Sequence, residues 1–195
     1  MNQSNPWLAA IQTDEPQPVV DEQAPVQQVA LWQPGQVAAP SAPGGLRTAP
    51  CQGGGRLWVV AAHGGAGATT VARLLDAGDA GQVWPAPRSG AVAAVVVARH
   101  HLSGLRAAQA AAIQWASGVI PGVHLVGLVL VADSPVKQPK ELADFQRLVM
   151  GAFPAVWHVE YVPAWRVNDP WDTQVPRSYK KVLTQVGAAF EGKTK

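Results

Sequence analysis

Four short apolar runs alternate with segments of helical spacing along residues 56–192, and few folds are compatible with that order. The apolar runs are rich in β-branched residues and are bounded by glycine or proline, which is typical of strands buried on both faces. Strands that alternate with helices form βαβ units with right-handed crossovers. We therefore predict an α/β fold, a small layered domain with a mostly parallel sheet of about four to five strands.

The boundaries of the predicted elements follow from the same pattern. Strands are expected at residues 56–62, 91–99, 124–133 and 155–162, and helices at residues 69–77, 102–117, 139–153 and 178–192. In the second helix, Ser103 is the expected N-cap and Gly118 the expected end. The interval 78–90 is predicted to be a loop, because it contains Gly78, Gly81 and Pro85.

Residues 1–54 differ from the rest of the chain in composition. They are rich in Pro, Gln, Ala and Val and show neither helical nor strand periodicity. Such a segment buries too little apolar surface to offset the entropy lost on ordering. We predict a disordered arm (1–54) followed by one α/β domain (55–195). Trp7 and Trp32 stand out in the arm, either as short docking motifs for a protein partner or as isolated hydrophobic residues.

Cysteine usage, hydropathy and charge exclude several classes of protein. Cys51 is the only cysteine, so the chain has no intrachain disulfide and no cysteine-based zinc site. No run approaches the ~18–20 apolar residues of a membrane span, and the first residues lack the pattern of a signal peptide. The formal net charge of +2 does not by itself indicate nucleic acid. We expect a cytoplasmic protein without membrane contact.

A glycine-rich segment, HGGAGATT at residues 63–70, lies between the first predicted strand and the first predicted helix. Its glycines allow consecutive main-chain N–H groups to curl inward, and the first turn of the next helix adds free N–H groups. This context predicts an anion nest for a phosphate group. Thr69 stands where such loops place the hydroxyl that binds Mg²⁺.

The segment resembles the deviant Walker A loop of ParA/MinD-type partition ATPases, which reads K-G-G-x-G-K-T-T. Five positions carry the residue of that motif: Gly64, Gly65, Gly67, Thr69 and Thr70. His63 stands at the signature lysine, Ala68 at the phosphate-clamping lysine and Ala62 at the first glycine. Over about residues 56–166 the chain is similar, more narrowly, to an uncharacterised actinobacterial family of ParA-like proteins, through HGGAGATT, ARHHLSGLRAAQAA, GLVLVAD and YVPAWR.

The resemblance implies a P-loop NTPase-like fold that binds ATP or ADP with Mg²⁺. Asp133 ends GLVLVAD where that family has an asparagine that supports the adenine, and EYVPAW is similar to its adenine-side segment. The chain lacks a D-x-x-G-like switch, and the interval between Ala77 and Ala91 leaves no room for the usual two-strand switch region. No carrier for the attacking water is therefore visible.

Loss of the lysine argues against hydrolysis. Phosphoryl transfer depends on neutralising the charge on the β- and γ-oxygens, and Ala68 removes a charge-assisted contact worth about 1.5–3 kcal/mol. His63 is a poor substitute, because histidine is mostly neutral near pH 7. We predict little or no ATP hydrolysis and assign no catalytic residue. The residues predicted to bind the ligand are His63, Gly64, Gly65, Ala66, Gly67, Ala68, Thr69, Thr70, Arg99 and Asp133.

Other interpretations of the loop stay open. The glycines can form a tight strand-to-helix turn that binds nothing, in which case the chain has no cofactor. A dinucleotide site is less well supported, because the loop does not read G-x-G-x-x-G. Arg99 leaves a strand at the edge that carries the loop and is the better candidate for contacting an anion, and Arg166 is a looser one; either can instead form a surface ion pair. His63, His100 and His101 could converge on a metal, but solvent-facing side chains are the simpler expectation.

The remaining aromatic and basic residues give weaker signals. Trp58, Trp115 and Trp157 fall in predicted elements and are expected in the core. Three others fall in proline-containing loops and form either a partner patch or a cover over the sheet edge: Trp84, Trp165 and Trp171. The C-terminal helix is basic through Lys180, Lys181, Lys193 and Lys195, which favours a solvated face over a DNA contact.

The sequence as a whole favours a ParA-like accessory module that binds a nucleotide or phosphate group without turning it over and recruits a partner through its arm. The resemblance suggests a role beside DNA partition or conjugative transfer. Two further hypotheses stay open: a pure interaction scaffold with an empty loop, and an active ATPase whose lysine comes from elsewhere. No Ser-His-Asp order or HExxH motif supports a hydrolase or metalloprotease.

Overall fold

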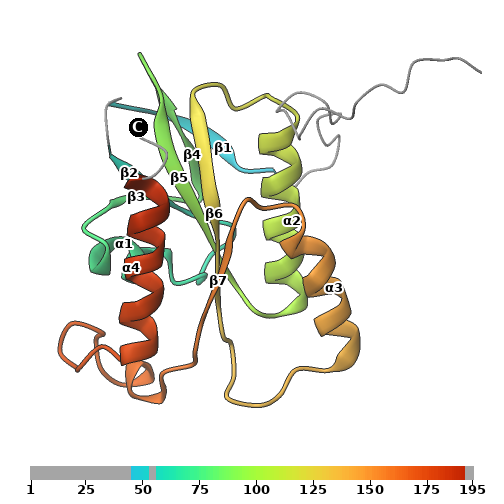
Figure 1. Ribbon diagram of the computed structural model, residues 1–195, viewed down its shortest axis with the longest axis vertical. Helices are drawn as coiled ribbons and strands as arrows, with labels where there is room; N and C mark the ends of the chain where they lie inside the picture. The colour runs from blue at the N-terminus through green and yellow to red at the C-terminus, as the bar shows by residue number, and fades with distance from the viewer. Residues whose placement is uncertain (1–44, 53–55, 192–195) are drawn as a thin grey trace, which may run out of the picture. The chain divides into compact units, whose positions relative to one another are not determined.

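The computed structural model describes residues 45–52 and 56–191, and its centre is a five-stranded parallel sheet (Figure 1). The strands lie in the order β3-β2-β5-β6-β7, and every neighbouring pair is parallel. Their bounds are β2 (Leu57–Ala61), β3 (Gly78–Gly81), β5 (Val92–Arg99), β6 (Val123–Val131) and β7 (Val156–Val159). The predicted α/β class with a mostly parallel sheet is confirmed.

The strand order puts a topological switch point beside β2. From β2 the chain first adds β3 on one side, and it later adds β5 on the other side. In open parallel sheets, ligands bind outside the carboxyl ends of the strands at the point where the order reverses. The loops that follow β2 and β5 flank that point.

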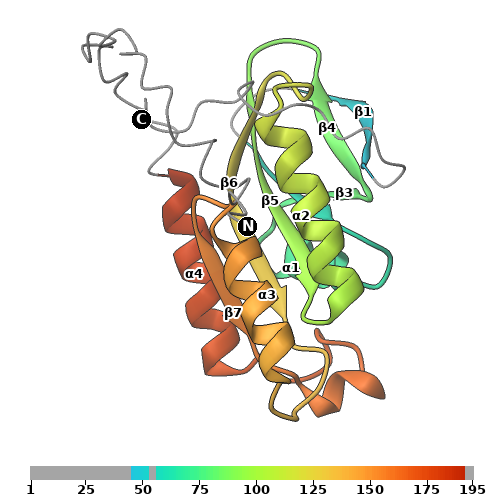
Figure 2. The same ribbon diagram turned by 90° about the vertical axis from the view of Figure 1, so that its right-hand side faces the viewer.

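Helices cover both faces of the sheet (Figures 1 and 2). One face carries α2 (Leu102–Ala116) and α3 (Lys140–Met150), and the other carries α1 (Ala68–Leu74) and α4 (Arg177–Glu191). Successive side chains of a strand point to opposite faces, so β5 supplies apolar residues to both cores. Ala94 and Val96 pack in the core under α2, whereas Val95 and Val97 pack in the core under α1 and α4.

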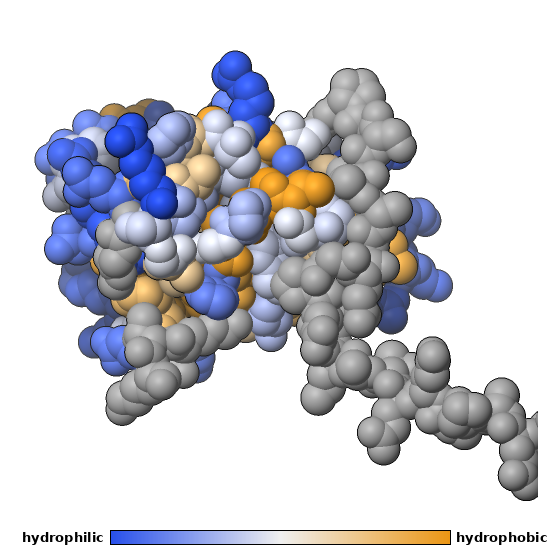
Figure 3. All heavy atoms as spheres, turned by 90° about the horizontal axis from the view of Figure 1, so that it is seen from above, coloured by the Kyte–Doolittle hydropathy of each residue, from blue (hydrophilic) through white to orange (hydrophobic). Residues whose placement is uncertain are grey.

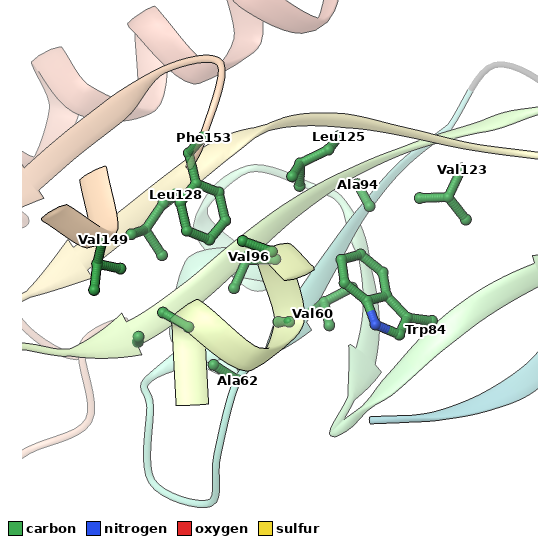
Figure 4. Close-up of a cluster of buried hydrophobic side chains, with 14 of the residues drawn as sticks. Val60, Ala62, Trp84, Ala94, Val96, Val123, Leu125, Leu128, Val149 and Phe153 are labelled. Carbon is green, nitrogen blue, oxygen red and sulfur yellow. The ribbon is translucent and has the colours of Figure 1, made fainter. Parts of the chain in front are cut away.

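Trp84 is the largest fully buried side chain, and it corrects the prediction that it lies in a loop. It belongs to β4 (Val83–Pro87) and is 0% exposed among Val60, Ala94 and Val123 (Figure 4). Its indole Nε1 donates a hydrogen bond to Gln114 Oε1 at 3.0 Å. Burial of a tryptophan with its N–H satisfied makes this residue a main anchor of the core.

The interval 78–90, predicted to be a loop without room for two strands, contains the short strands β3 and β4. Both are polar or proline-rich, so neither gives an apolar period that the sequence could reveal. β4 pairs in parallel with β1 (Arg47–Cys51) in a separate two-stranded sheet. Long-range pairing and the burial of Trp84 therefore override the local signals of a loop.

The strand β1 also corrects the predicted extent of the disordered arm, because residues 47–51 were assigned to it. Besides the ladder to β4, the chain is held at Leu46 by the side chain of Gln114. The Leu46 N–H donates to Gln114 Oε1 at 2.9 Å, and Gln114 Nε2 donates to the Leu46 carbonyl at 2.7 Å. Both contacts bridge residues far apart in sequence, so local composition did not predict them. Trp7 and Trp32 lie outside the described residues.

Most predicted helices and strands are confirmed, with shorter ends. The first helix ends at Leu74 rather than residue 77, and the third covers Lys140–Met150 rather than residues 139–153. After β7 the chain forms the 3-10 helix η2 (Pro163–Arg166). Within the described part of the chain, no helix has the length and apolar character needed to cross a membrane.

Large apolar side chains that remain exposed are scattered over several elements. They are Leu102, Val119, Val136, Leu148, Val167 and Trp171. Figure 3 views the end of the sheet opposite to the glycine-rich loop, where a small apolar area lies among polar side chains. Single exposed hydrophobic residues are ordinary on protein surfaces and indicate no particular partner.

Candidate functional site

The glycine-rich loop joins β2 to α1 in a conformation that needs glycine at two positions. Gly65 has φ 75° and Gly67 has φ 92°, a left-handed backbone region that side chains with a Cβ rarely adopt. The Ala66 N–H donates to the His63 carbonyl at 3.3 Å, which closes a tight turn. The sequence HGGAGATT thus encodes a specific turn rather than a flexible spacer.

Many N–H groups of this turn are unpaired. In the described part of the chain, six consecutive or neighbouring main-chain donors make no hydrogen bond: those of Gly64, Gly65, Gly67, Ala68, Thr69 and Thr70. The helix that follows has only seven residues, so its dipole adds little. Free amide donors in a glycine turn are nevertheless what an anion nest requires.

Arg99, the last residue of β5, ties this loop to the neighbouring strands. Its Nε donates to the Gly65 carbonyl at 3.1 Å and its Nη1 donates to the Ala132 carbonyl at 3.2 Å. Arg99 is half-buried and forms no ion pair with a carboxylate of the described residues. A cation is therefore held at the mouth of the loop with its charge uncompensated.

His63 is fixed by two hydrogen bonds of opposite kind. Its Nδ1 lies 2.8 Å from the Gly64 carbonyl oxygen, and its Nε2 accepts the Arg99 main-chain N–H at 3.1 Å. Both bonds are satisfied by the neutral tautomer that carries its proton on Nδ1. His63 is thus a structural link between the two loops and not the cation that replaces the lost lysine.

Close packing also joins the two loops to α2. A Cβ added to Gly104 would lie 2.2 Å from the Arg99 carbonyl oxygen and 3.0 Å from His63 Nε2. The N-cap of α2 is His101, whose Nδ1 accepts the Gly104 N–H at 2.9 Å. This corrects the prediction of Ser103 as the cap, since the Ser103 hydroxyl instead lies 3.0 Å from that Nδ1.

Three cavities meet around Arg99 at the carboxyl edge of the sheet. The first, of about 400 Å³, is lined by the loop from His63 to Thr70 together with Asp79, Gln82 and Arg99. The second, of about 550 Å³, shares part of the loop and Arg99, and it adds Asp133 and Arg166. The third, of about 80 Å³, lies between Arg99 and the buried Tyr179. The first two volumes are in the range of small-molecule sites.

The structure therefore brings together every residue predicted to bind the ligand. The loop residues and Arg99 line the first cavity, although the side chains of Ala66 and Ala68 point into the core, where they are 1% and 4% exposed. Asp133 lines the second cavity with Arg166. The hydrogen bond to Tyr161 and, less strongly, the charge of Asp133 raise the pKa of Arg166. Within the described residues, both predicted arginines, Arg99 and Arg166, thus lie at the carboxyl edge of the sheet.

Two sets of residues in these cavities were not among the predicted ligand-binding residues. Asp79 and Gln82 line the first cavity, and the Asp79 carboxylate accepts the Gly81 N–H at 2.9 Å. Their segment was assigned to a loop without function. The negative charge of Asp79 disfavours a phosphate in the nest unless a cation lies between the two. Mg²⁺ is a suitable cation, because it prefers oxygen ligands such as those of Asp79 and Thr69.

The second set is aromatic and lies in the second and third cavities. Trp165 contacts Tyr179 edge to face at 4.8 Å between ring centroids, and its Nε1 donates to Thr173 at 2.8 Å. Burial raises the pKa of Tyr179 to about 12, and the nearby charge of Arg99 only partly opposes this. Trp171 lies elsewhere, under Arg73 at 4.0 Å, so the three loop tryptophans form no single patch.

The histidines do not converge as a metal site of three. His63 and His101 lie together at 5.2 Å between ring centroids, whereas His100 pairs with His158 at 6.4 Å on the α3 side. In the ranges that the structure describes, no group of three or more His, Cys, Asp or Glu side chains could hold a metal. His100 and His101 are neighbours in sequence but belong to different ring pairs.

The second histidine pair gives a prediction about pH. Burial lowers the pKa of His100 and of His158 from 6.5, and each ring is further disfavoured by a neighbouring histidine charge, His101 and His100 respectively. The Gln146 side chain opposes part of the shift of His100. The unfolded chain therefore takes up protons that the folded chain does not, and the free energy of unfolding falls as pH drops below about 6.5.

Urea unfolding at a series of pH values from about 7.5 down to about 5 measures this loss. We expect the wild type to have its full free energy of unfolding above pH 6.5. Below that pH, the free energy of unfolding should fall less steeply in His158→Gln than in the wild type. The exposed His124 on β6 offers the matched control, and His124→Gln should keep the wild-type dependence. An unchanged slope in His158→Gln would contradict the prediction.

The fold and the site define an α/β protein with a parallel sheet and a glycine-rich loop at its switch point. The chain belongs to a family of unknown function, DUF6668, whose family model matches residues 55–183. A search of curated proteins and a search of solved structures found no match.

Proposed function

We propose that this protein is a ParA-like P-loop module that binds a nucleotide or phosphate group with little or no hydrolysis and acts as an accessory or regulatory protein. One observation carries the proposal: a half-buried arginine without a carboxylate partner shares a cavity with a turn full of unpaired amide donors. Free amides and an uncompensated cation both favour an anion, and burial strengthens their effect.

Arg99 takes the part of the missing lysine in this proposal. Its guanidinium carries five donors, and the structure uses two of them for main-chain carbonyls. The others are free to contact phosphate oxygens. Arg99 reaches the loop from β5, whereas the lysine of the motif stands within the loop, at the position of Ala68. The positive charge is therefore present, but it lies in a different place from that of the motif lysine.

The same geometry argues against turnover. None of the residues that line the three cavities is a lysine, which disfavours an ATPase with a lysine from elsewhere in the described chain. Asp79 and Thr69 are suited to hold Mg²⁺ against a bound phosphate. The role of the ion would be to screen the negative charge of the phosphate. The ligand is then a structural or regulatory group, and the resemblance to ParA-like proteins suggests a role beside DNA partition or conjugative transfer, with the N-terminal arm recruiting a partner.

Thermal unfolding with a panel of ligands tests the proposal. A ligand at 100 times its Kd adds about 2.7 kcal/mol to the free energy of unfolding. We expect stabilisation by ATP, ADP and pyrophosphate, more with Mg²⁺ than without it, and none by adenosine alone. Phosphate release should stay at background.

The alternatives give different results in the same experiment. Stabilisation by none of the ligands would contradict the proposal and leave an interaction scaffold, in which Arg99 only closes the loop. Phosphate release that Thr69→Ala abolishes would contradict it in the other direction and establish an ATPase.

A further inference from the structure

A second cluster of ligand-type side chains lies on the face of the sheet that α3 covers, apart from the loop. His100 follows the carboxyl end of β5, and His158 lies in β7. Gln146 and Met150 lie on α3, four residues apart and therefore on one face of that helix. None of the four lines the three cavities around Arg99.

The amide nitrogen of Gln146 lies close to two of the other three side chains. Gln146 Nε2 lies 3.2 Å from the sulfur of Met150 and 3.5 Å from His158 Nε2. The His100 ring lies 6.4 Å from the His158 ring. In the part of the chain that the structure describes, the buried Nε2 of His100 makes no hydrogen bond of good geometry, although the Gln146 side chain lies near enough to raise the pKa of His100. A buried imidazole nitrogen without a partner is a feature that needs an explanation.

None of the four side chains is a carboxylate, and no carboxylate is among the groups that act on either imidazole. Metals bind imidazole through a ring nitrogen that carries no proton. The absence of carboxylate ligands in the cluster disfavours hard cations such as Mg²⁺ and Ca²⁺.

We propose that His100, His158 and Met150 form a binding site for one soft metal ion, Cu(I), and that the Gln146 amide fills the centre of this site in the metal-free protein. Imidazole and thioether together select Cu(I), because thioether sulfur is a soft ligand. Structural and catalytic zinc sites use Cys, His and carboxylate ligands instead, so Zn²⁺ should bind this set more weakly.

The rearrangement that binding requires is small. Metal–nitrogen and metal–sulfur bonds are about 2.0–2.3 Å. For an ion that takes the place of Gln146 Nε2, the sulfur of Met150 must therefore approach by roughly 1 Å and Nε2 of His158 by roughly 1.5 Å. Gln146 is half-buried, and His158 keeps an exposed surface although its surroundings are close enough for burial to lower its pKa. The amide can therefore turn to solvent, and an ion can reach the cluster. Val149 is the one completely buried residue of α3, and Leu142, Phe145 and Met150 pack partly buried against the core.

The test uses the full-length protein and Cu(I) itself, supplied under anaerobic conditions against a chromophoric Cu(I) chelator. The chain has only two methionines, Met1 and Met150, so isotope-labelled methionine methyl groups give two NMR signals. We expect one equivalent of Cu(I) to shift the Met150 signal and to leave the Met1 signal in place. A shift of Met1 alone, or no shift, would overturn the proposal.

Variants separate this site from other Cu(I) ligands. Met150→Leu keeps the volume of the side chain, and it should weaken Cu(I) binding about tenfold or more, as should His158→Gln. Gln146→Ala removes the competing amide and should tighten binding. His124→Gln and Cys51→Ser are the matched controls and should bind as the wild type does. Loss of binding in Cys51→Ser, or wild-type binding in Met150→Leu, would show that the ion is held elsewhere.

Discussion

Trp84→Ala should destabilise the fold by about 3–5 kcal/mol, the largest loss we expect from a single substitution in this chain. Trp84 is 0% exposed and packs between β2, β5 and β6, so its removal leaves a cavity that rigid strands cannot fill. It also removes the donor to Gln114, whose amide holds the chain at Leu46. Because folded domains are stable by only about 5–15 kcal/mol, much of the margin would be lost.

Urea unfolding measures the loss, and two variants identify its cause. Trp84→Phe keeps an apolar ring but no N–H donor and should cost less than the alanine variant. Trp171→Ala removes an exposed ring that lies under Arg73 in a cation–π interaction, which is worth about 0.5–1 kcal/mol at such a site. If Trp84→Ala were no more destabilised than Trp171→Ala, the core would not depend on β4 as described.

Arg99→Met should weaken binding of ATP or pyrophosphate by roughly 10- to 150-fold. One charge-assisted hydrogen bond is worth about 1.5–3 kcal/mol, and each 1.4 kcal/mol is a factor of about ten in affinity. Methionine keeps an extended apolar side chain but has no charge and no donor. Isothermal calorimetry at fixed salt measures the effect.

Two controls distinguish the charge of Arg99 from its structural contacts. Arg99→Lys keeps the charge but loses the fork that reaches Gly65 and Ala132, so we expect binding between wild type and Arg99→Met. Arg73→Met removes an exposed cation of α1 that lines none of the three cavities, and it should bind as the wild type does. Equal affinity of Arg99→Met and the wild type would exclude Arg99 from the site.

Four of the five strands of the main sheet were predictable, because β2, β5, β6 and β7 carry their own signal. β5 and β6 are long runs of Val, Leu and Ala, and burial on both faces requires such runs in a parallel sheet. β3 reads GDAG, β4 reads VWPAP and β1 reads RTAPC. These strands are defined by pairing with distant segments and by the burial of Trp84, and short polar or proline-rich segments contain no period that predicts pairing.

The candidate site was predictable in part for a related reason. Parallel strands end at one edge, so the loop after β2 and Arg99 at the end of β5 were expected to be neighbours, and they are. Asp79 was missed as a site residue because its position depends on β3, and Trp165 was placed beside the site only by the resemblance of EYVPAW to an adenine-side segment. The role of His63 was also beyond sequence reasoning, since its two hydrogen bonds depend on the exact approach of Arg99 and α2.

The most direct test of phosphate binding by the loop is an NMR titration of its main-chain amides with pyrophosphate and with ATP. Binding in the nest should shift the amide signals of Gly64, Gly65 and Gly67 most, together with the first residues of α1, while the signals of β1 and α3 stay in place. Arg99→Met should reduce these shifts at the same ligand concentration. Loop amides that keep their positions at saturating pyrophosphate would contradict the account and leave the turn with a structural role alone.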